Sequence, residues 1–461
     1  MTVRQKPVER QVIVITGASS GIGLATAHMA AERGARLVLV ARSADDLTEV
    51  ARECGRLGGS AVPVAADVSV REDVERVAQA AVETYGGFDT WVNNASVSIY
   101  GKLLDMPVED QRHLFDVNYW GLVYGSLAAA RHLRARGGTL INVGSVLSDR
   151  TMVYQTQYSS SKHAVKAFTD GLRMELEAEE APISVTLIKP SGIDTPFPEH
   201  ARNYLGGAAP TVPPPAYDPH VVGKAILFAA ENPKRTLTVG FGGAAIGLMG
   251  SLLPRATDFV MEKTGFATQV TDTPPRPGAA DNLYEGREDG DAYSNQPHLT
   301  RRSSLYLEAQ MHPLTTFALL AGVGVGAALL LGRSSSSEKR RAAAPQPAYE
   351  QDFWEEDERD LAPHDEDEVF RDPRPMPGAM GARSVYEARE ADRTRAPLAP
   401  DEAFRTPSAA PTSTASGGGD PRLISPDAPE DAFRDPLQGR SGQGGHGGTG
   451  AGPGSAGRLP V

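Results

Sequence analysis

The sequence predicts an α/β domain with a doubly wound parallel sheet, followed by a linker, one transmembrane helix and a disordered tail. Short apolar runs alternate with helical patterns over the first half of the chain. Strands that are apolar throughout indicate a parallel sheet with helices on both faces. A glycine-rich turn directly follows the first run, as in doubly wound folds that bind a ligand at the carboxyl ends of their strands.

The elements are placed by their residue patterns. β-Branched and aliphatic residues between turn residues predict strands at 11–16, 35–41, 60–67, 88–94, 138–145, 183–190 and 236–240. Amphipathic stretches predict helices at 22–33, 45–57, 71–85, 107–136 and 157–179. Right-handed crossovers between such strands give the doubly wound order.

Composition excludes several classes of protein. The net charge of −12 over 461 residues argues against a nucleic-acid partner, which favours a basic face. The single cysteine, Cys54, cannot form an internal disulfide or a multi-cysteine zinc site, and we expect no metal. The N-terminus lacks the apolar stretch of a signal peptide.

Two later segments are candidates to cover a site. The range 195–217 is rich in Pro and Gly and is expected to be a loop, either a lid or a solvated insertion. The apolar range 239–254 is expected to line a pocket with it or to pack on the sheet or a partner subunit. Their apolar character points to a lipophilic substrate.

The rest of the chain is divided by composition. A catalytic domain is expected over 8–263, a flexible linker over 264–311, a transmembrane helix over 312–332 and a disordered tail over 333–461. Residues 314–331 carry no charge and as a helix span about 27 Å, close to the thickness of a bilayer's hydrocarbon core. A buried core helix or a re-entrant segment is the alternative.

The tail contains a loose repeat, EVFRDP, EAFRTP and DAFRDP, centred on Phe370, Phe404 and Phe433. The repeat is either a set of short motifs for a protein partner or compositional drift. Gly322 and Gly326 form a GxxxG pair that is compatible with self-association of the membrane helix.

The turn TGASSGIG (16–23) lies between the first strand and the first helix. Gly17, Gly21 and Gly23 allow a tight turn and a close approach of backbone N–H groups to a pyrophosphate at the helix N-terminus. The alternative is a purely structural turn. This placement predicts a dinucleotide site.

The second strand ends in Arg42 rather than in the acid that binds a ribose 2′-hydroxyl. A guanidinium suits a 2′-phosphate, so NADP(H) is favoured over NAD(H). The alternative is a solvent-facing Arg42 with Asp45 or Asp46 on the ribose. Asp67 ends strand three, where it is placed to bond the adenine edge, and NNAS (93–96) ends strand four.

TGASSGIG, Asp67-Val68, NNAS, Asn118, Ser145 and Tyr158-x-x-x-Lys162 resemble, in order and spacing, the short-chain dehydrogenase/reductase family over roughly residues 8–263. The resemblance implies a Rossmann fold, a homo-oligomer and a catalytic tetrad of Asn118, Ser145, Tyr158 and Lys162. The expected cofactor-binding residues are Gly17, Ser19, Ser20, Gly21, Ile22, Gly23, Arg42, Asp67, Val68, Asn94, Ala95, Tyr158, Lys162, Pro190, Ile193 and Thr195.

The spacing of Tyr158 and Lys162 supports these roles. Residues four apart share one face of a helix. A nearby ammonium, together with the positive charge of the nicotinamide in the oxidised cofactor, favours the phenolate and should lower the pKa of Tyr158, which then acts as general acid or base. Ser145 would hold the substrate oxygen, Lys162 would also bond the nicotinamide ribose, and Asn118 would support a water-linked proton path.

Two positions depart from the family pattern. Ser96 stands where NNAG has glycine, and Ser191 stands where PG follows strand six. We expect these small changes to alter loop geometry and to leave cofactor binding in place.

The motifs favour an enzyme that interconverts a carbonyl and an alcohol with NADP(H). A non-catalytic NADP-binding scaffold at a membrane, or an adaptor that acts through its tail, are the alternatives. The expected location is the cell membrane with the catalytic domain in the cytoplasm. The flanking basic residues mildly favour a cytoplasmic tail as well, and one span cannot satisfy both.

Overall fold

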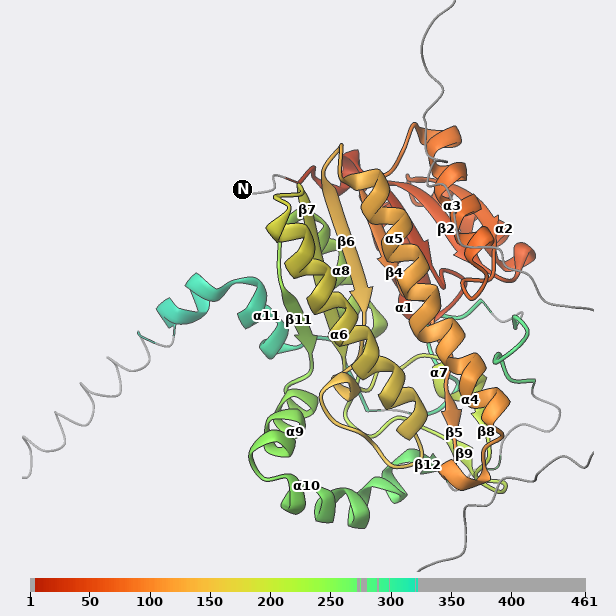
Figure 1. The fold of residues 1–461 in the computed structure, drawn as a ribbon, viewed down its shortest axis with the longest axis vertical. Helices are drawn as coiled ribbons and strands as arrows, with labels where there is room; N and C mark the ends of the chain where they lie inside the picture. The colour runs from red at the N-terminus through yellow and green to blue at the C-terminus, as the bar shows by residue number, and fades with distance from the viewer. Residues whose placement is uncertain are drawn as a thin grey trace, which may run out of the picture. The chain divides into compact units, whose positions relative to one another are not determined.

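The computed structural model describes residues 5–271, 274, 280–287, 290–297, 299–319 and 321. Its centre is a seven-stranded, wholly parallel sheet (Figure 1) in the order β11-β7-β6-β4-β1-β2-β3. The strands are β1 (Val12–Thr16), β2 (Arg36–Ala41), β3 (Ser60–Ala65), β4 (Thr90–Asn93), β6 (Gly138–Val143), β7 (Ile183–Pro190) and β11 (Thr236–Val239). The predicted doubly wound parallel sheet is confirmed, and its order reverses between β1 and β4.

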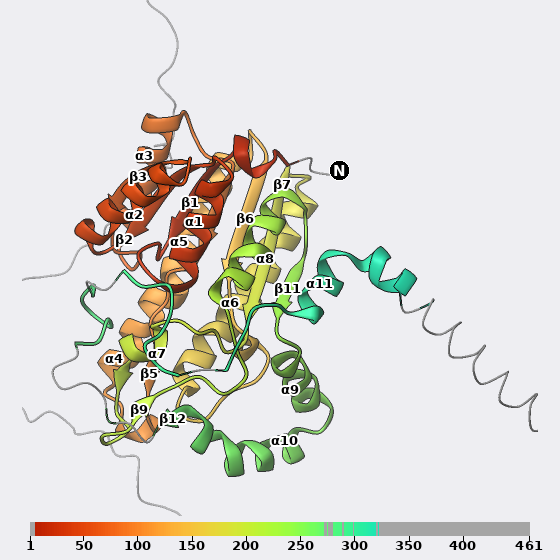
Figure 2. The same cartoon turned by 180° about the vertical axis from the view of Figure 1, so that it is seen from behind.

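Helices cover both faces of the sheet. The helices α5 (Gly121–Leu133) and α6 (Thr156–Ala178) lie in front of it in Figure 1, with α3 (Arg71–Tyr85) on the same face. The helices α1 (Gly21–Glu32), α2 (Ala44–Arg56) and α8 (Pro219–Glu231) cover the other face, which Figure 2 brings forward.

The strands are apolar throughout because alternate residues enter different cores. Ile13 and Ile15 pack with α1 and α8, whereas Val12 and Val14 pack with α3 and α5. Successive side chains of a strand point to opposite faces, so both sets are buried here. This is the physical reason why the strand runs could be read from the sequence.

The helix predicted over 107–136 has a different internal structure. It consists of α4 (Val108–Phe115), a π-helical turn η3 (Asp116–Trp120) and α5. Such turns insert one extra residue per turn and often occur at functional sites. Asn118 lies in this turn and is buried.

The segment 195–217 contains a short helix, α7 (Phe197–His200), and three two-residue strands. The strands are β8 (Arg202–Asn203), β9 (Ala209–Pro210) and β10 (Ala216–Tyr217), which pair with β5 (Ile99–Tyr100), β12 (Val270–Thr271) and β13 (Thr300–Arg301) respectively. The segment is therefore tied to the domain at three places, unlike a solvated insertion.

After β11 the chain forms α9 (Phe241–Leu252), α10 (Pro254–Val260) and the π-helical turn η5 (Met261–Gly265). The remaining short elements are the single turns η1 (Val8–Arg10), η2 (Leu103–Asp105), η4 (Val146–Ser148) and η6 (Ala267–Gln269).

The range 264–311 differs from the expected flexible linker, because its described residues pack on the domain. Helix α11 (Leu305–Met311) buries Leu307 and Met311 in the core next to β11. The Gln310 side chain accepts from Thr238 N at 2.9 Å and donates to Thr238 O at 2.9 Å. These bonds satisfy the free backbone edge of β11, which a terminal strand would otherwise expose.

Most of the predicted membrane segment, residue 320 and residues 322–331, lies outside the described residues, as does the tail from 333. Within the described residues, no helix is both long and apolar enough to span a bilayer.

Candidate active site

One cavity of about 380 Å³ lies along the carboxyl ends of the strands, where the strand order reverses. Its wall brings together nearly all of the site residues expected from the sequence. They are Gly17, Ser19, Ser20, Gly21, Ile22, Arg42, Asp67, Val68, Asn94, Ala95, Ser145, Tyr158, Lys162, Pro190, Ile193 and Thr195. Gly23 and Asn118 stand behind this wall.

The glycine turn forms a closely packed cradle at the start of α1. Gly17 has φ +66°, and a Cβ atom there would lie 2.9 Å from Ala95 Cα. A Cβ atom on Gly23 would lie 1.9 Å from Gly17 O, which leaves no room for a side chain. Asn94 Nδ2 donates to Thr16 O at 2.9 Å and to Gly17 O at 3.1 Å and so fixes the turn.

The cradle suits a phosphate group. The side chain of Ser20, the N-cap residue of α1, makes no capping bond to the helix within the described structure. The first backbone N–H groups of a helix carry partial positive charge and bind anions. Gly21 N donates to Asp291 O at 2.9 Å, so a pyrophosphate at this position would replace that backbone contact.

Arg42 lies at the far end of the cavity and is half-buried. Its Nη2 donates to Asn282 O at 2.5 Å and its Nη1 donates to Leu283 O at 3.4 Å. Burial lowers the pKa of its guanidinium, and the charge of Asp67 partly opposes this. Asp45 and Asp46 are not among the described residues that line the cavity, so the geometry favours Arg42 over them as the group that meets a cofactor.

Asp67 and Ile193 are partly engaged by their own surroundings. Asp67 Oδ1 accepts from Ser69 N at 2.8 Å and from Ser69 Oγ at 2.7 Å, which fixes the turn after β3. Ile193 forms a backbone bridge with Tyr217, and the methyl group of Thr195 lies over Gly21. Ser191 Oγ is buried and has no hydrogen-bond partner among the described residues, so a bound amide could satisfy it.

Tyr158, Lys162 and Ser145 converge in the middle of the cavity. Tyr158 and Lys162 project from one face of α6, and the Lys162 ammonium nitrogen is 5.6 Å from the centre of the Tyr158 ring. Lys162 Nζ donates to Val143 O at 3.1 Å. Ser145, just after β6, lies close enough to the Tyr158 hydroxyl to influence its pKa.

The pKa of Tyr158 differs from the expected lowering. Burial raises the pKa of Tyr158 to about 12, although the nearby Ser145 hydroxyl opposes the shift. Burial lowers the pKa of Lys162 to about 7, so the lysine is only partly charged at neutral pH. Desolvation acts on both groups and weakens the lysine charge that favours the phenolate, so the expected lowering would depend on the positive charge of a bound nicotinamide.

Asn118 has a structural role that the sequence did not reveal. Its Oδ1 accepts from Ser96 Oγ at 3.0 Å and from Val97 N at 2.8 Å. Its Nδ2 donates to Val97 O at 2.9 Å and to Ser161 Oγ at 3.2 Å. An amide has two donors and two acceptor sites, so these four bonds saturate the Asn118 side chain.

The same bonds explain one departure from the family pattern. Ser96, in place of the glycine of NNAG, supplies a hydroxyl that binds Asn118 directly. Asn118 then joins the loop after β4 to α6 through Ser161. The two residues hold the helix that carries Tyr158 and Lys162.

The outer half of the cavity is built by residues from distant parts of the chain. The expected pocket segments contribute Val212, Pro213, Pro214, Pro215, Gly242, Gly243 and Ile246, and sequence reasoning missed Val146, Leu147, Met152, Gln155, Met261, Gln269, Asn282, Gly286 and Arg287. No motif marks the missed residues, because they lie in the connection between β6 and α6 or in segments after β11, whose positions depend on tertiary packing.

Comparison with known proteins supports the family that the sequence motifs resemble. The family described as short chain dehydrogenase matches residues 11–204. The uncharacterized oxidoreductase YxnA of Bacillus subtilis is 46% identical over 329 residues, which is 71% of this chain and 92% of that protein. The putative oxidoreductase SadH of Mycobacterium tuberculosis is 30% identical over 53% of this chain and 91% of its own length.

Solved structures show a weaker likeness. A short chain dehydrogenase from Burkholderia cenocepacia, in complex with NADP, has a TM-score of 0.47 at 26% identity and covers 56% of this chain and 99% of its own. An alcohol dehydrogenase from Thermococcus sibiricus, complexed with 5-hydroxy-NADP, has a TM-score of 0.44 at 27% identity and covers 50% and 95% respectively.

Burial of Lys162 predicts a pH-dependent stability. A lysine in an unfolded chain titrates near pH 10.4, whereas Lys162 in the folded chain titrates at about 7. Between these values the unfolded chain binds the extra proton, so stability rises with pH. The difference in free energy of unfolding between the wild type and Lys162→Met should therefore change in favour of the wild type from pH 7 to 9.5, by up to about 1.4 kcal/mol per pH unit.

Urea unfolding at a series of pH values measures this difference. Lys166→Met is the matched control, because Lys166 lies one turn further along α6 with an exposed side chain. If the free energies of unfolding of the wild type and Lys162→Met changed with pH in parallel, that result would contradict a buried, uncharged lysine.

Proposed function

Because the chain belongs to the short-chain dehydrogenase family, and is thus an NAD(P)-dependent oxidoreductase that acts on CH–OH groups, we propose that it uses NADP(H) to interconvert a lipophilic ketone or aldehyde and its alcohol. One observation carries the proposal. A single cavity joins a phosphate cradle and a half-buried arginine at one end to Tyr158, Lys162 and Ser145 at the other.

The proposed chemistry divides between the cofactor and the protein. The reduced nicotinamide supplies a hydride to the carbonyl carbon of the substrate. The hydroxyl groups of Ser145 and Tyr158 bind the carbonyl oxygen, and Tyr158 donates its proton to that oxygen as charge develops there. Lys162 lies beside the ring of Tyr158, where its charged form stabilises the phenolate that remains.

The pKa values support reduction at neutral pH. A Tyr158 pKa of about 12 keeps the phenol protonated, so the general acid is ready throughout the neutral range. Alcohol oxidation needs the phenolate as base, and its population grows as the pH rises toward 12. The oxidation rate should therefore increase with pH more steeply than the reduction rate.

Arg42 supports NADP(H) over NAD(H). Within the described part of the chain, no carboxylate lies within ion-pairing distance of its guanidinium, and its hydrogen bonds go to neutral carbonyl oxygens. The charge of Asp67 offsets only part of the desolvation of this half-buried cation. A 2′-phosphate would supply a further anion, with the planar fork geometry that arginine favours.

The substrate half of the cavity supports a lipophilic compound. Its wall includes the apolar side chains of Leu147, Met152 and Ile246 beside the polar ones of Arg150, Gln155 and Gln269. Apolar walls around a few converging polar groups are usual for pockets that orient small molecules.

A membrane tether is a further part of the proposal. The uncharged run 314–331 is long enough to span a bilayer, and α11 delivers the chain to its start. We place the catalytic domain on the cytoplasmic side, where NADP(H) is available, and expect a homo-oligomer as in the family. The role of the tail as a docking site for a protein partner belongs to the same proposal.

Replacing Tyr158 by Phe tests the chemistry. Loss of the proton donor should lower kcat for NADPH-dependent reduction of lipophilic ketones by about 10²- to 10⁴-fold. The loss of NADPH absorbance measures the rate. Tyr119→Phe, next to Asn118 and outside the cavity wall, is the control and should keep wild-type activity. Unchanged turnover in Tyr158→Phe would rule out the proposed mechanism.

Replacing Arg42 by Ala tests the cofactor. Removal of a charge-assisted phosphate contact should raise the Kd for NADPH by about 10- to 100-fold and leave that for NADH almost unchanged. Fluorescence titration of both cofactors measures the two constants. A wild-type protein that binds NADH as tightly as NADPH would contradict this assignment.

Cell fractionation tests the tether. The full chain should sediment with membranes and resist extraction by salt, whereas a chain that ends at residue 313 should remain in the supernatant. A full chain found in the supernatant would remove the tether from the proposal.

A further inference from the structure

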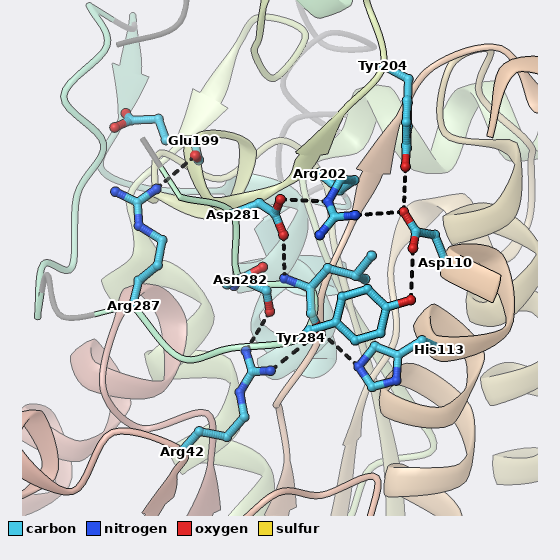
Figure 3. A network of polar contacts seen from close by, with 11 residues as sticks. Arg42, Asp110, His113, Glu199, Arg202, Tyr204, Asp281, Asn282, Tyr284 and Arg287 are labelled. Carbon is cyan, nitrogen blue, oxygen red and sulfur yellow. Dashed lines mark hydrogen bonds and ion pairs between the residues drawn. The ribbon is translucent and has the colours of Figure 1, made fainter. Parts of the chain in front are cut away.

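Residues 281–287, which we call the strap, cross the Arg42 end of the cavity (Figure 3). They come more than forty residues after the last strand of the sheet, yet Asn282, Gly286 and Arg287 form part of the cavity wall. The backbone carbonyls of Asn282 and Leu283 are the two acceptors of the Arg42 guanidinium, at 2.5 and 3.4 Å.

The strap lies close against the turn that carries Arg42. A Cβ atom on Gly286 would lie 3.3 Å from Arg42 Cβ and 3.4 Å from Ser43 N. Contacts this short leave little space for any side chain at position 286. The chain therefore passes directly over the end of β2, where Arg42 is expected to bind the 2′-phosphate of the cofactor ribose.

A buried carboxylate anchors the strap. Asp110, in α4, accepts from Tyr284 Oη at 2.8 Å, from Tyr204 Oη at 2.5 Å and from Arg202 Nη1 at 2.9 Å. Arg202 Nε also donates to Asp281 Oδ2 at 2.6 Å. Figure 3 shows these side chains meeting around Asp110 from three separate parts of the chain.

A histidine completes the anchor. The ring of His113 stacks on Tyr284 with a centroid distance of 4.4 Å, and its Nε2 hydrogen-bonds Leu283 O at 2.9 Å. Leu283 O therefore contacts both Arg42 and His113. A network with several charge-assisted bonds to one buried carboxylate holds a loop in a fixed position.

This arrangement orients Arg42 without neutralising it. A guanidinium has five N–H donors, and the two carbonyl oxygens take only two of them. The other three remain for an anion, and the carbonyls carry no net charge that would replace one. The strap thus limits the rotation of a long side chain and so lowers the entropy cost of binding a phosphate.

We propose that the strap is the outer wall of the 2′-phosphate end of the cofactor site, and that its main chain positions Arg42 for that phosphate. Asn282 and Leu283 are then positioning residues that act through their backbone carbonyls. The inference rests on the proposed use of NADP(H), and it adds that cofactor selectivity depends on residues outside the doubly wound domain.

The double variant Asp281→Ala/Tyr284→Ala tests the inference in the full chain, because it releases the anchor and leaves Arg42 in place. The Kd for NADPH should rise about tenfold, while the Kd for NADH should change by less than about twofold. The ratio of the two constants is the decisive quantity, since a general loss of stability would weaken both cofactors equally.

Tyr293→Ala is the matched control. Tyr293, like the strap, belongs to the described residues after β12, which we call the C-terminal extension. Its hydroxyl bonds Asp218 and His220 rather than Asp110. Its removal should leave the ratio of the constants at the wild-type value. Tyr284→Phe, which keeps the ring on His113 and loses only the hydroxyl, should shift the ratio in the same direction by a smaller factor, and circular dichroism verifies folding.

The outcomes distinguish the inferred role of the strap from the proposed use of NADP(H). A wild type that prefers NADPH, together with a double variant and a Tyr284→Phe protein that keep the same preference, overturns the role of the strap alone. Tighter NADPH binding in the variants also overturns it, because the strap would then compete with the phosphate. A wild type without any preference contradicts the proposed cofactor, and the inference falls with it.

Discussion

Burial of Tyr158 and Lys162 side by side is the constraint on which the site depends. Each group titrates away from its usual pH because water is excluded, and each is driven toward its uncharged form. Two such groups stay buried only if the helix that carries them is fixed on the domain. Asn118 and Ser96 fix it by hydrogen bonds between the loop after β4 and α6. Asn118 thus supports the site by holding the helix that carries Tyr158 and Lys162.

The second feature is the contribution of the C-terminal extension to the domain. Leu307 and Met311 fill the core beside β11, and Gln310 satisfies the backbone of that edge strand. Ser294 and Thr300 bond the two carboxylate oxygens of Asp194, each at 2.6 Å, just before the segment 195–217. The extension therefore holds the cavity from outside, and truncation before it would disturb both the cofactor and the substrate halves.

The sequence predicted the elements that a repeated pattern specifies. Strands such as Val12–Thr16 are buried on both faces, so an unbroken apolar run identifies them, and the glycines of 16–23 are required by a turn with no space for side chains. The sequence patterns did not predict the features that depend on tertiary contacts. Leu307 and Met311 are too sparse to mark a helix, and the saturated amide of Asn118 depends on its contacts with the loop after β4 and with α6. The raised pKa of Tyr158 follows from burial, which spacing alone does not give.

The central claim is that one cavity aligns a dinucleotide between Arg42 and Tyr158. A crystal structure of the full chain with NADP⁺ tests it most directly. We expect the pyrophosphate over the glycine turn, the 2′-phosphate within hydrogen-bond distance of the Arg42 guanidinium, and the nicotinamide beside Tyr158 and Lys162. A cofactor bound elsewhere, or with its 2′-phosphate directed away from Arg42, would contradict the account.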